Sequence, residues 1–210
     1  MNEKQINREF AIVGFDKDLL FDLIVCGHSI YGYFSLEDKF NGYRYLGDHE
    51  NIGKIPENIP VIVSVDDINL RAQLFSEYEK RLTTYISPTA TIAPNAIIGA
   101  GGLVMSNTLI STSVSIGRCT KINVGVQVHH DVRIGDFCVI APRVLLLGNV
   151  EVENSSFLGS GCMIRNNIKI SKNSTIGMAS NVIQDVPPNS VCFGNPATIK
   201  KYNAPASSEA

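Results

Sequence analysis

The residues best suited to chemistry in this sequence are two adjacent histidines and the aspartate that follows them, His129, His130 and Asp131. An imidazole is neutral near pH 7 and can take a proton from an attacking amine or hydroxyl. A neighbouring carboxylate can fix the tautomer of such a ring and favour its charged form. We therefore expect His130 to act as a general base that Asp131 orients, with His129 as the alternative base.

The region that carries these residues repeats with a period of six. From Ile86 to Val182 every sixth residue is Ile, Leu or Val, without one insertion, and a small or β-branched residue follows each of them four positions later. This period predicts a three-sided β-helix whose aliphatic side chains point inward and stack on their equivalents three hexads later. No charged side chain fits inside so narrow a prism. His130 and Asp131 are therefore expected on its outer surface, near an edge.

Upstream of about residue 85 the pattern is that of alternating short strands and helices. Strands are expected at residues 10–13, 31–36 and 61–65, and helices at 16–29, capped by Asp16, and at 68–82, capped by Asp66 or Asp67. This order predicts a small α/β domain with a mainly parallel, Rossmann-like sheet. The expected domains are 1–84 for this unit, 85–187 for the all-β helix, and 188–210 for a C-terminal segment that ends in a frayed tail at 204–210.

Composition excludes several classes of function. The chain has 210 residues and a formal net charge of −2, so it offers no basic field for nucleic acid. No apolar run approaches the roughly 18–20 residues of a membrane span, and the polar N-terminus has no signal-peptide core, which predicts a cytoplasmic protein. Five cysteines without a CxxC motif do not indicate disulfides or structural zinc. Cys138 and Cys162 fall in the inward column of small residues and are expected to be buried and not nucleophilic.

A hexad ladder that ends in the segment Gly194-Asn195-Pro196-Ala197 resembles the left-handed β-helix acyltransferases. Together with the front unit, joined through residues 85–90, it is similar to sugar acetyltransferases of bacterial surface-glycan pathways. These include sialic-acid O-acetyltransferases and nucleotide-4-amino-sugar N-acetyltransferases. The resemblance implies a homotrimer with acceptor sites at the subunit interfaces, and two histidines in the repeat are too few to predict a metal site. It also implies direct transfer of an acetyl group from acetyl-CoA, bound between neighbouring prisms, to a nucleotide-linked 4-amino-4,6-dideoxy sugar.

The resemblance also implies site residues for the acetyl donor. Relatives carry a catalytic histidine followed by an acidic residue at the positions of His130 and Asp131. Gly148 lies one coil above His130, and its N–H group is a candidate donor to a tetrahedral oxyanion, although a plain turn glycine fits the pattern equally well. The remaining expected coenzyme contacts are Ser160, Gly161, Met178, Ala179, Asn195, Pro196 and Lys200.

The expected acceptor-binding residues lie in the front unit, at Gly14, Lys17, Glu37 and Asp38. Relatives have a glycine-rich loop after the first strand, but here only Gly14 remains of it. Asp16 and Asp18 stand where a diphosphate would approach the N-terminus of a helix. They should repel it unless Lys17 compensates, and this departure weakens the assignment of a nucleotide-sugar.

Two alternatives therefore stay open. One is O-acetylation of a sugar hydroxyl, as in sialic-acid modification. The other is a metal-dependent or non-catalytic hexad-repeat protein, although the repeat region contains only His129 and His130 as histidines.

Overall fold

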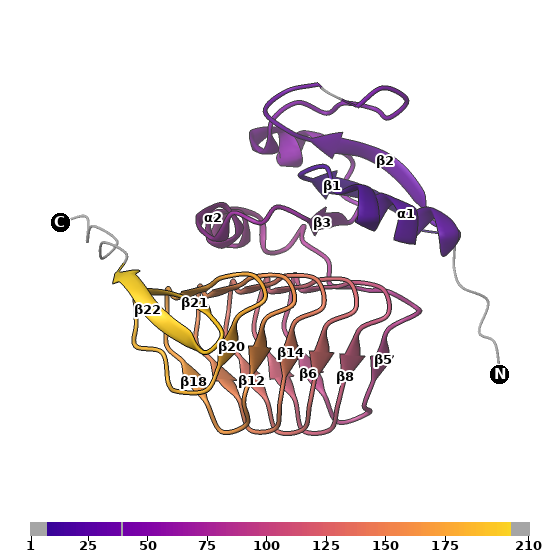
Figure 1. Cartoon of the computed structure of the whole chain (residues 1–210). Helices are drawn as coiled ribbons and strands as arrows, with labels where there is room; N and C mark the ends of the chain where they lie inside the picture. The colour runs from indigo at the N-terminus through magenta and orange to yellow at the C-terminus, as the bar shows by residue number, and fades with distance from the viewer. Residues whose placement is uncertain (1–7, 39, 203–210) are drawn as a thin grey trace.

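The chain folds into a small α/β unit seated on a long, triangular β-helix, which we call the prism (Figure 1). The computed structural model describes residues 8–38 and 40–202. The polar segment at residues 1–7 and the predicted tail at 204–210 lie outside the described residues.

The α/β unit contains a three-stranded parallel sheet in the order β2-β1-β3, which confirms the predicted parallel sheet. Its elements are β1 (Glu9–Val13), α1 (Lys17–Val25), β2 (Ser29–Phe34), the 3-10 helix η1 (His49–Lys54), β3 (Val61–Val63) and α2 (Ile68–Tyr78). Asp16 caps α1 as predicted, and Asp67 rather than Asp66 caps α2.

The element boundaries in this unit differ from the sequence-based ones. The helix predicted over 16–29 ends at Val25, because Gly27 has a φ of 77° and the next strand already begins at Ser29. A backbone in the left-handed region cannot continue an α-helix. The helix predicted over 68–82 likewise ends early, at Tyr78.

The prism has three parallel faces, which we call A, B and C in the order in which the chain visits them. Face A contains β4 (Tyr85–Ile86), β7 (Leu103–Val104), β10 (Lys121–Ile122), β13 (Val139–Ile140), β16 (Phe157–Leu158), β19 (Thr175–Ile176), β21 (Ser190–Gly194) and β22 (Ala197–Tyr202). Face B contains β5 (Thr91–Ile92), β8 (Leu109–Ile110), β11 (Gln127–Val128), β14 (Leu145–Leu146), β17 (Met163–Ile164) and β20 (Asn181–Val182). Face C contains β6 (Ile97–Ile98), β9 (Ser115–Ile116), β12 (Arg133–Ile134), β15 (Glu151–Val152) and β18 (Lys169–Ile170). On face A, the last strand β22 runs antiparallel to β21.

The register of the prism is the one that the hexads predict. Ile122, for example, pairs with Ile140 on one side and with Val104 on the other. The aliphatic ladder forms the core of the prism. At its open N-terminal end, Ile86 is 41% exposed because no coil lies below it.

The α/β unit covers the N-terminal part of face A (Figure 1). Leu103 and Met105 of the prism share an apolar cluster with Leu19 of α1. Within residues 8–38 and 40–202, the contacts of the α/β unit fall on face A and its two edges, and none falls on the edge between faces B and C. The chain enters the prism at Tyr85 and leaves the hexad ladder after Val186.

Candidate active site

His130 and Asp131 form a hydrogen-bonded pair on the edge between faces B and C. The turn from β11 to β12 carries both residues, and Nδ1 of His130 lies 2.8 Å from Oδ2 of Asp131. Their side chains are 54% and 51% exposed, as expected for groups that cannot enter the prism. Asp131 has a φ of 61°, which bends the chain around the edge and directs its carboxylate back to the preceding ring. The pair has the geometry of an imidazole whose tautomer is fixed by a carboxylate.

Gly148 lies directly above the His130 ring. A Cβ atom on Gly148 would stand 2.5 Å from Cε1 and 2.6 Å from Nε2 of His130. Any other residue at position 148 would therefore clash with the imidazole ring in its present position. The sequence predicted open space here, and the imidazole itself fills that space. Within the described residues the Gly148 N–H donates to no acceptor, whereas its carbonyl accepts from Asn167 N at 3.1 Å. The residue that packs on the His130 ring therefore has a backbone N–H without an acceptor among the described residues.

His129 is a neighbour of this pair but not part of it. Its backbone N–H donates to the Leu146 carbonyl at 3.0 Å. In the part of the chain that the structure describes, no carboxylate or other group hydrogen-bonds to its ring. Because only His130 has an orienting carboxylate, the geometry favours His130 as the base.

The predicted pantetheine contacts lie on a different edge. Ser160, Gly161, Met178 and Ala179 occupy consecutive turns between faces A and B, where Ala179 N donates to the Ser160 carbonyl at 3.0 Å. Met178 is 75% exposed. Within one chain, face B separates these residues from His130 and Gly148. The sequence-predicted donor site is thus divided between two edges.

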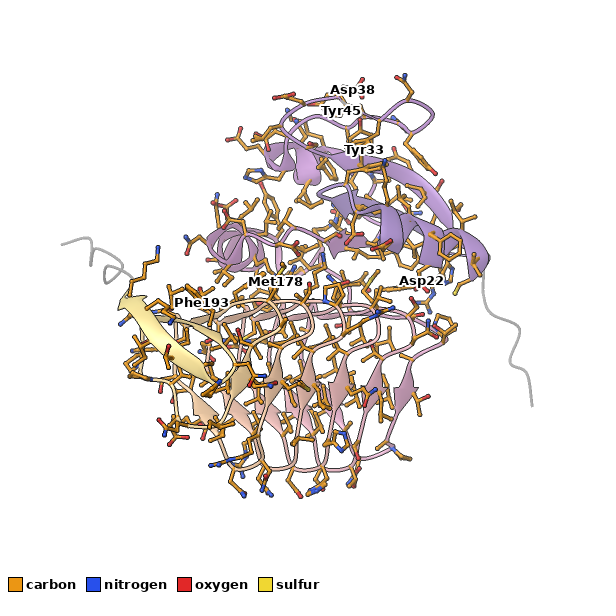
Figure 2. All side chains as sticks on the ribbon, in the orientation of Figure 1. Asp22, Tyr33, Asp38, Tyr45, Met178 and Phe193 are labelled. Atoms are coloured by element: carbon orange, nitrogen blue, oxygen red, sulfur yellow. The ribbon has the colours of Figure 1, made fainter. Side chains whose placement is uncertain are left out.

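Asn195, Pro196 and Lys200 lie at the C-terminal end of the prism, in and beside the turn that joins β21 to β22. All three are exposed. Lys200 Nζ stands 5.2 Å from the centre of the Phe193 ring, and Phe193 and Met178 are both visible on the prism below the α/β unit (Figure 2). Phe193 was not among the predicted contacts.

A pocket of about 460 Å³ lies at the carboxyl ends of β1, β2 and β3, and we call it the strand-end pocket. Gly14 and Glu37 line it, together with Asp48 and His49, which sequence reasoning missed. Ligands of parallel α/β sheets bind at this end of the strands. Asp38, the other predicted acidic residue, instead accepts a hydrogen bond from the Tyr33 hydroxyl at 2.5 Å, on the side of the unit away from the prism (Figure 2).

A second pocket of about 600 Å³, the interdomain pocket, lies between the α/β unit and the A–B edge of the prism. Gly14 and Val65 line both pockets, so the two adjoin. Lys17 is exposed at the rim of the interdomain pocket, and Asn123 and Pro142 line it from the prism side. The predicted acceptor residues Gly14, Lys17 and Glu37 are therefore brought to one region, and Asp38 is not.

Lys121, not Lys17, compensates the charge of Asp16. Lys121 projects from face A into the interdomain pocket and is 3% exposed, with its ammonium 2.9 Å from Asp16, from Asp66 and from the Ser64 carbonyl. Burial alone would raise the pKa of Asp16, but the Lys121 charge and the hydrogen bonds of the carboxylate lower it below its usual value. The sequence left open whether Lys17 compensates the two aspartates. In the structure the cation paired with Asp16 is Lys121, from a hexad position that has no sequence signal of its own.

Arg71 of α2 crosses the same interface in the opposite direction. It is fully buried and donates to the Cys119 carbonyl of the prism at 2.7 Å and to the Val65 carbonyl at 2.7 Å. Together Lys121 and Arg71 fix the loop that divides the two pockets. The sequence did not predict these buried roles, because lysine and arginine side chains are usually exposed.

The cysteines are placed as predicted. Cys138 and Cys162 are buried in the inner column, and burial raises the pKa of each thiol to about 12. Neither is suited to be a nucleophile at neutral pH. Among the described residues no three His, Cys, Asp or Glu side chains gather where they could hold a metal ion, and no helix there is long and apolar enough to cross a membrane. A metal-free reaction and a cytoplasmic location stay predictions.

The comparisons with known proteins agree with this architecture. Residues 113–148, which include His130, Asp131 and Gly148, match the family model described as bacterial transferase hexapeptide (six repeats). The chain is 32% identical over 81 residues to GDP-perosamine N-acetyltransferase of Escherichia coli O157:H7, which covers 39% of this chain and 37% of that one. It is 34% identical over 114 residues to an acyl-[acyl-carrier-protein]–UDP-N-acetylglucosamine O-acyltransferase of Nautilia profundicola, covering 51% and 44%. The chain thus spans less than half the length of these curated relatives.

Solved structures match over nearly the whole chain. A histidine-to-asparagine variant of perosamine N-acetyltransferase from Caulobacter crescentus, in complex with CoA and GDP-perosamine, has a TM-score of 0.85 and 27% identity, covering 93% of this chain and 98% of that one. The acetyltransferase domain of PglB from Neisseria gonorrhoeae has a TM-score of 0.84 and 25% identity, covering 92% and 100%. The left-handed β-helix preceded by a small α/β unit is thereby confirmed, as is the resemblance to hexapeptide-repeat sugar acetyltransferases.

Proposed function

We propose that this protein is an acetyltransferase that uses acetyl-CoA to N-acetylate a nucleotide-linked amino sugar. The observation that carries the proposal is the exposed His130–Asp131 pair beside the free N–H of Gly148. The likeness to an enzyme whose structure holds CoA and GDP-perosamine supports both substrate classes. A 4-amino-4,6-dideoxy sugar and a role in surface-glycan synthesis are the finer parts of the same proposal.

In this proposal His130 removes a proton from the attacking amine. Asp131 accepts a hydrogen bond from Nδ1, which leaves the lone pair of Nε2 directed away from the carboxylate. The amine nitrogen attacks the thioester carbonyl carbon while Nε2 takes the amine proton. The resulting imidazolium is stabilised by the Asp131 carboxylate at 2.8 Å.

Collapse of the tetrahedral intermediate completes the transfer. The Gly148 N–H is the candidate donor to the oxyanion, since it has no acceptor among the described residues and belongs to the residue that packs on the His130 ring. The carbon–sulfur bond breaks, and the CoA thiolate leaves with the proton that His130 returns. No acyl-enzyme is needed, which agrees with the burial of the inner-column cysteines.

The division of the donor residues between two edges favours a site shared by two copies of the chain. The A–B edge carries Ser160 and Met178 next to the interdomain pocket, whereas His130 lies on the B–C edge. A contact between the A–B edge of one copy and the B–C edge of the next is heterologous, and such contacts form a ring when the rotation between copies closes. We infer a homotrimer with acetyl-CoA between neighbouring prisms, and with the acceptor held in the strand-end and interdomain pockets.

The test is a thiol-release assay with acetyl-CoA and a panel of nucleotide-linked amino sugars. We expect turnover with at least one 4-amino sugar and none with its hydroxyl analogue. His130→Asn should lower turnover by about 10²–10⁴-fold while the protein still binds CoA. Turnover that is unchanged in this variant would contradict the proposed base.

O-acetylation of a sugar hydroxyl is a second candidate, and one observation favours it. The carboxylate of Asp16 caps α1 and occupies the place where a diphosphate would meet the helix N-terminus. Calorimetric titration with UDP, dTDP and GDP separates the two candidates, with Glu37 variants as controls. Absence of all nucleotide binding would favour the acetylation of a free sugar.

A further inference from the structure

Four hydrogen-bond donors converge on the carboxylate of Asp16. Its Oδ1 accepts from the backbone N–H groups of Asp18 at 3.0 Å and Leu19 at 3.2 Å, at the N-terminus of α1. Its Oδ2 accepts from the Ser64 hydroxyl at 3.0 Å and from the Lys121 ammonium at 2.9 Å. These donors come from three separate parts of the chain, so the arrangement is more than an ordinary helix cap.

This donor set is one that anions bind. Backbone N–H groups at a helix N-terminus, a lysine ammonium and a serine hydroxyl are the partners that proteins offer to phosphate oxygens. Here the ammonium is almost fully buried, and a cavity of about 600 Å³ opens beside it. The anion position therefore exists, and a side chain of the chain itself fills it.

We propose that Asp16 is a specificity-determining residue that occupies an anion-binding position and keeps a diphosphate out of it. The acceptor then owes its affinity to the groups that it places in the strand-end pocket, and its diphosphate, when it has one, contributes little. The inference rests on the proposed function only in taking the interdomain pocket as part of the acceptor site.

The charges around the pocket agree with this assignment. Asp16, Asp18, Asp66 and Asp67 line the pocket against only Lys17 and Lys121. Lys121 is already shared between Asp16 and Asp66. A diphosphate that entered beside Asp16 would meet more negative than positive charge, which disfavours it strongly at short range.

The direct test is calorimetric binding of inorganic pyrophosphate to the full chain and to its variants. Asp16→Ser keeps a hydroxyl that can cap α1 but removes the anion, so the Lys121 ammonium and the Ser64 hydroxyl lose this partner and become available to pyrophosphate. We expect this variant to bind pyrophosphate at least about tenfold more tightly than the unaltered protein, as charge-assisted hydrogen bonds would allow.

Asp18→Ser is the matched control. Asp18 is exposed at the same helix end, and its removal changes the net charge equally but leaves the four donors engaged with Asp16. We expect the gain from Asp18→Ser to stay well below that from Asp16→Ser, because only the general charge of the pocket changes. We also expect the gain of Asp16→Ser to disappear when Lys121→Met is added, because the ammonium is then missing.

Equal pyrophosphate affinity of the unaltered protein and Asp16→Ser would overturn the inference, as would an equal gain in both serine variants. If Asp16→Ser lacks a cooperative melting transition, the test is instead to compare the affinities of the unaltered protein for guanosine and for GDP. Affinities within about threefold support the inference, and GDP binding more than tenfold tighter overturns it. If the proposed function is wrong, acetyl transfer will be absent in the thiol-release assay. The pyrophosphate titration does not depend on that result.

Discussion

Two clusters of this protein each combine a basic side chain with aspartate, but they differ in exposure and in the number of hydrogen bonds. On the B–C edge, His130 and Asp131 are each about half exposed and share one hydrogen bond. Between the α/β unit and face A, Lys121 is 3% exposed and has three partners at 2.9 Å. The edge pair retains unused hydrogen-bonding capacity, whereas the interface cluster has little left.

This difference in exposure distinguishes side chains that can react with a substrate from side chains that hold two parts of the fold together. A base must keep a free lone pair and reach its substrate, which requires exposure at an edge. A buried ammonium must satisfy its donors internally, and in doing so it fixes the elements that supply the acceptors. Substitutions in the first cluster should therefore change the rate, and substitutions in the second should change stability.

The largest expected effect is on the rate of acetyl transfer in His130→Ala. Loss of a general base should lower kcat by about 10²–10⁴-fold. Because the ring is 54% exposed and outside the core, the denaturation midpoint should stay close to that of the unaltered protein. Steady-state kinetics and thermal melting measure the two effects. A large loss of stability in this variant would break the contrast between the clusters.

Lys121→Met should show the opposite profile. Its removal leaves the Asp16 carboxylate, whose side chain is only 18% exposed, without its countercharge, and breaking a buried pair in this way costs about 3–5 kcal/mol. We expect the lower end of that range, because Asp66 is 62% exposed and can rehydrate. Urea unfolding provides the measurement. Lys169→Ala, which breaks an exposed ion pair with Glu151 and Glu153, is the matched control and should hardly move the midpoint.

Gly148→Ala sharpens the description of the edge cluster. The new Cβ atom would stand 2.5 Å from Cε1 of His130, so the ring must move away from its position. A displacement of about 1 Å can lower a rate on the order of 10²-fold, and we expect a loss of that order with little change in stability. A fully active Gly148→Ala variant would show that the reaction does not require the His130 ring in its present position.

The smallest effect concerns acid stability. The pKa of Asp16 is lower in the folded protein than its usual value of 3.8, so its stabilising effect is complete above that pH and is lost as the pH falls through the folded pKa. The difference in unfolding free energy between the unaltered protein and Asp16→Asn should therefore shrink below about pH 4. A difference that stays constant down to pH 2 would show that Asp16 is not held as an anion.

The prism could be predicted almost residue by residue. Each hexad position has one environment, so the inward place of Ile122 and the outward place of His130 follow from counting. The α/β unit was predicted less well, because its boundaries depend on single turns such as that at Gly27. The pairing of His130 with Asp131 was predictable, since the two are adjacent and both must lie outside.

The interface between the two units could not be predicted. Lys121 stands at an outward hexad position like many others, and nothing in its neighbourhood indicates that Asp16, more than a hundred residues earlier, will cover it. Arg71 likewise lies on a helix whose face toward the prism is set by docking.

The most direct test of a shared site is complementation in mixed assemblies. His130→Ala inactivates the B–C edge, and Ser160→Trp should block the A–B edge with a bulky side chain. If every site combines the B–C edge of one copy with the A–B edge of the next, random equimolar mixing of the two inactive variants should restore about a quarter of the sites in a cyclic assembly. A shared site predicts thiol release at about a quarter of the unaltered rate after co-refolding. Mixtures as inactive as their parents, despite exchange of subunits shown by mass spectrometry, would contradict it.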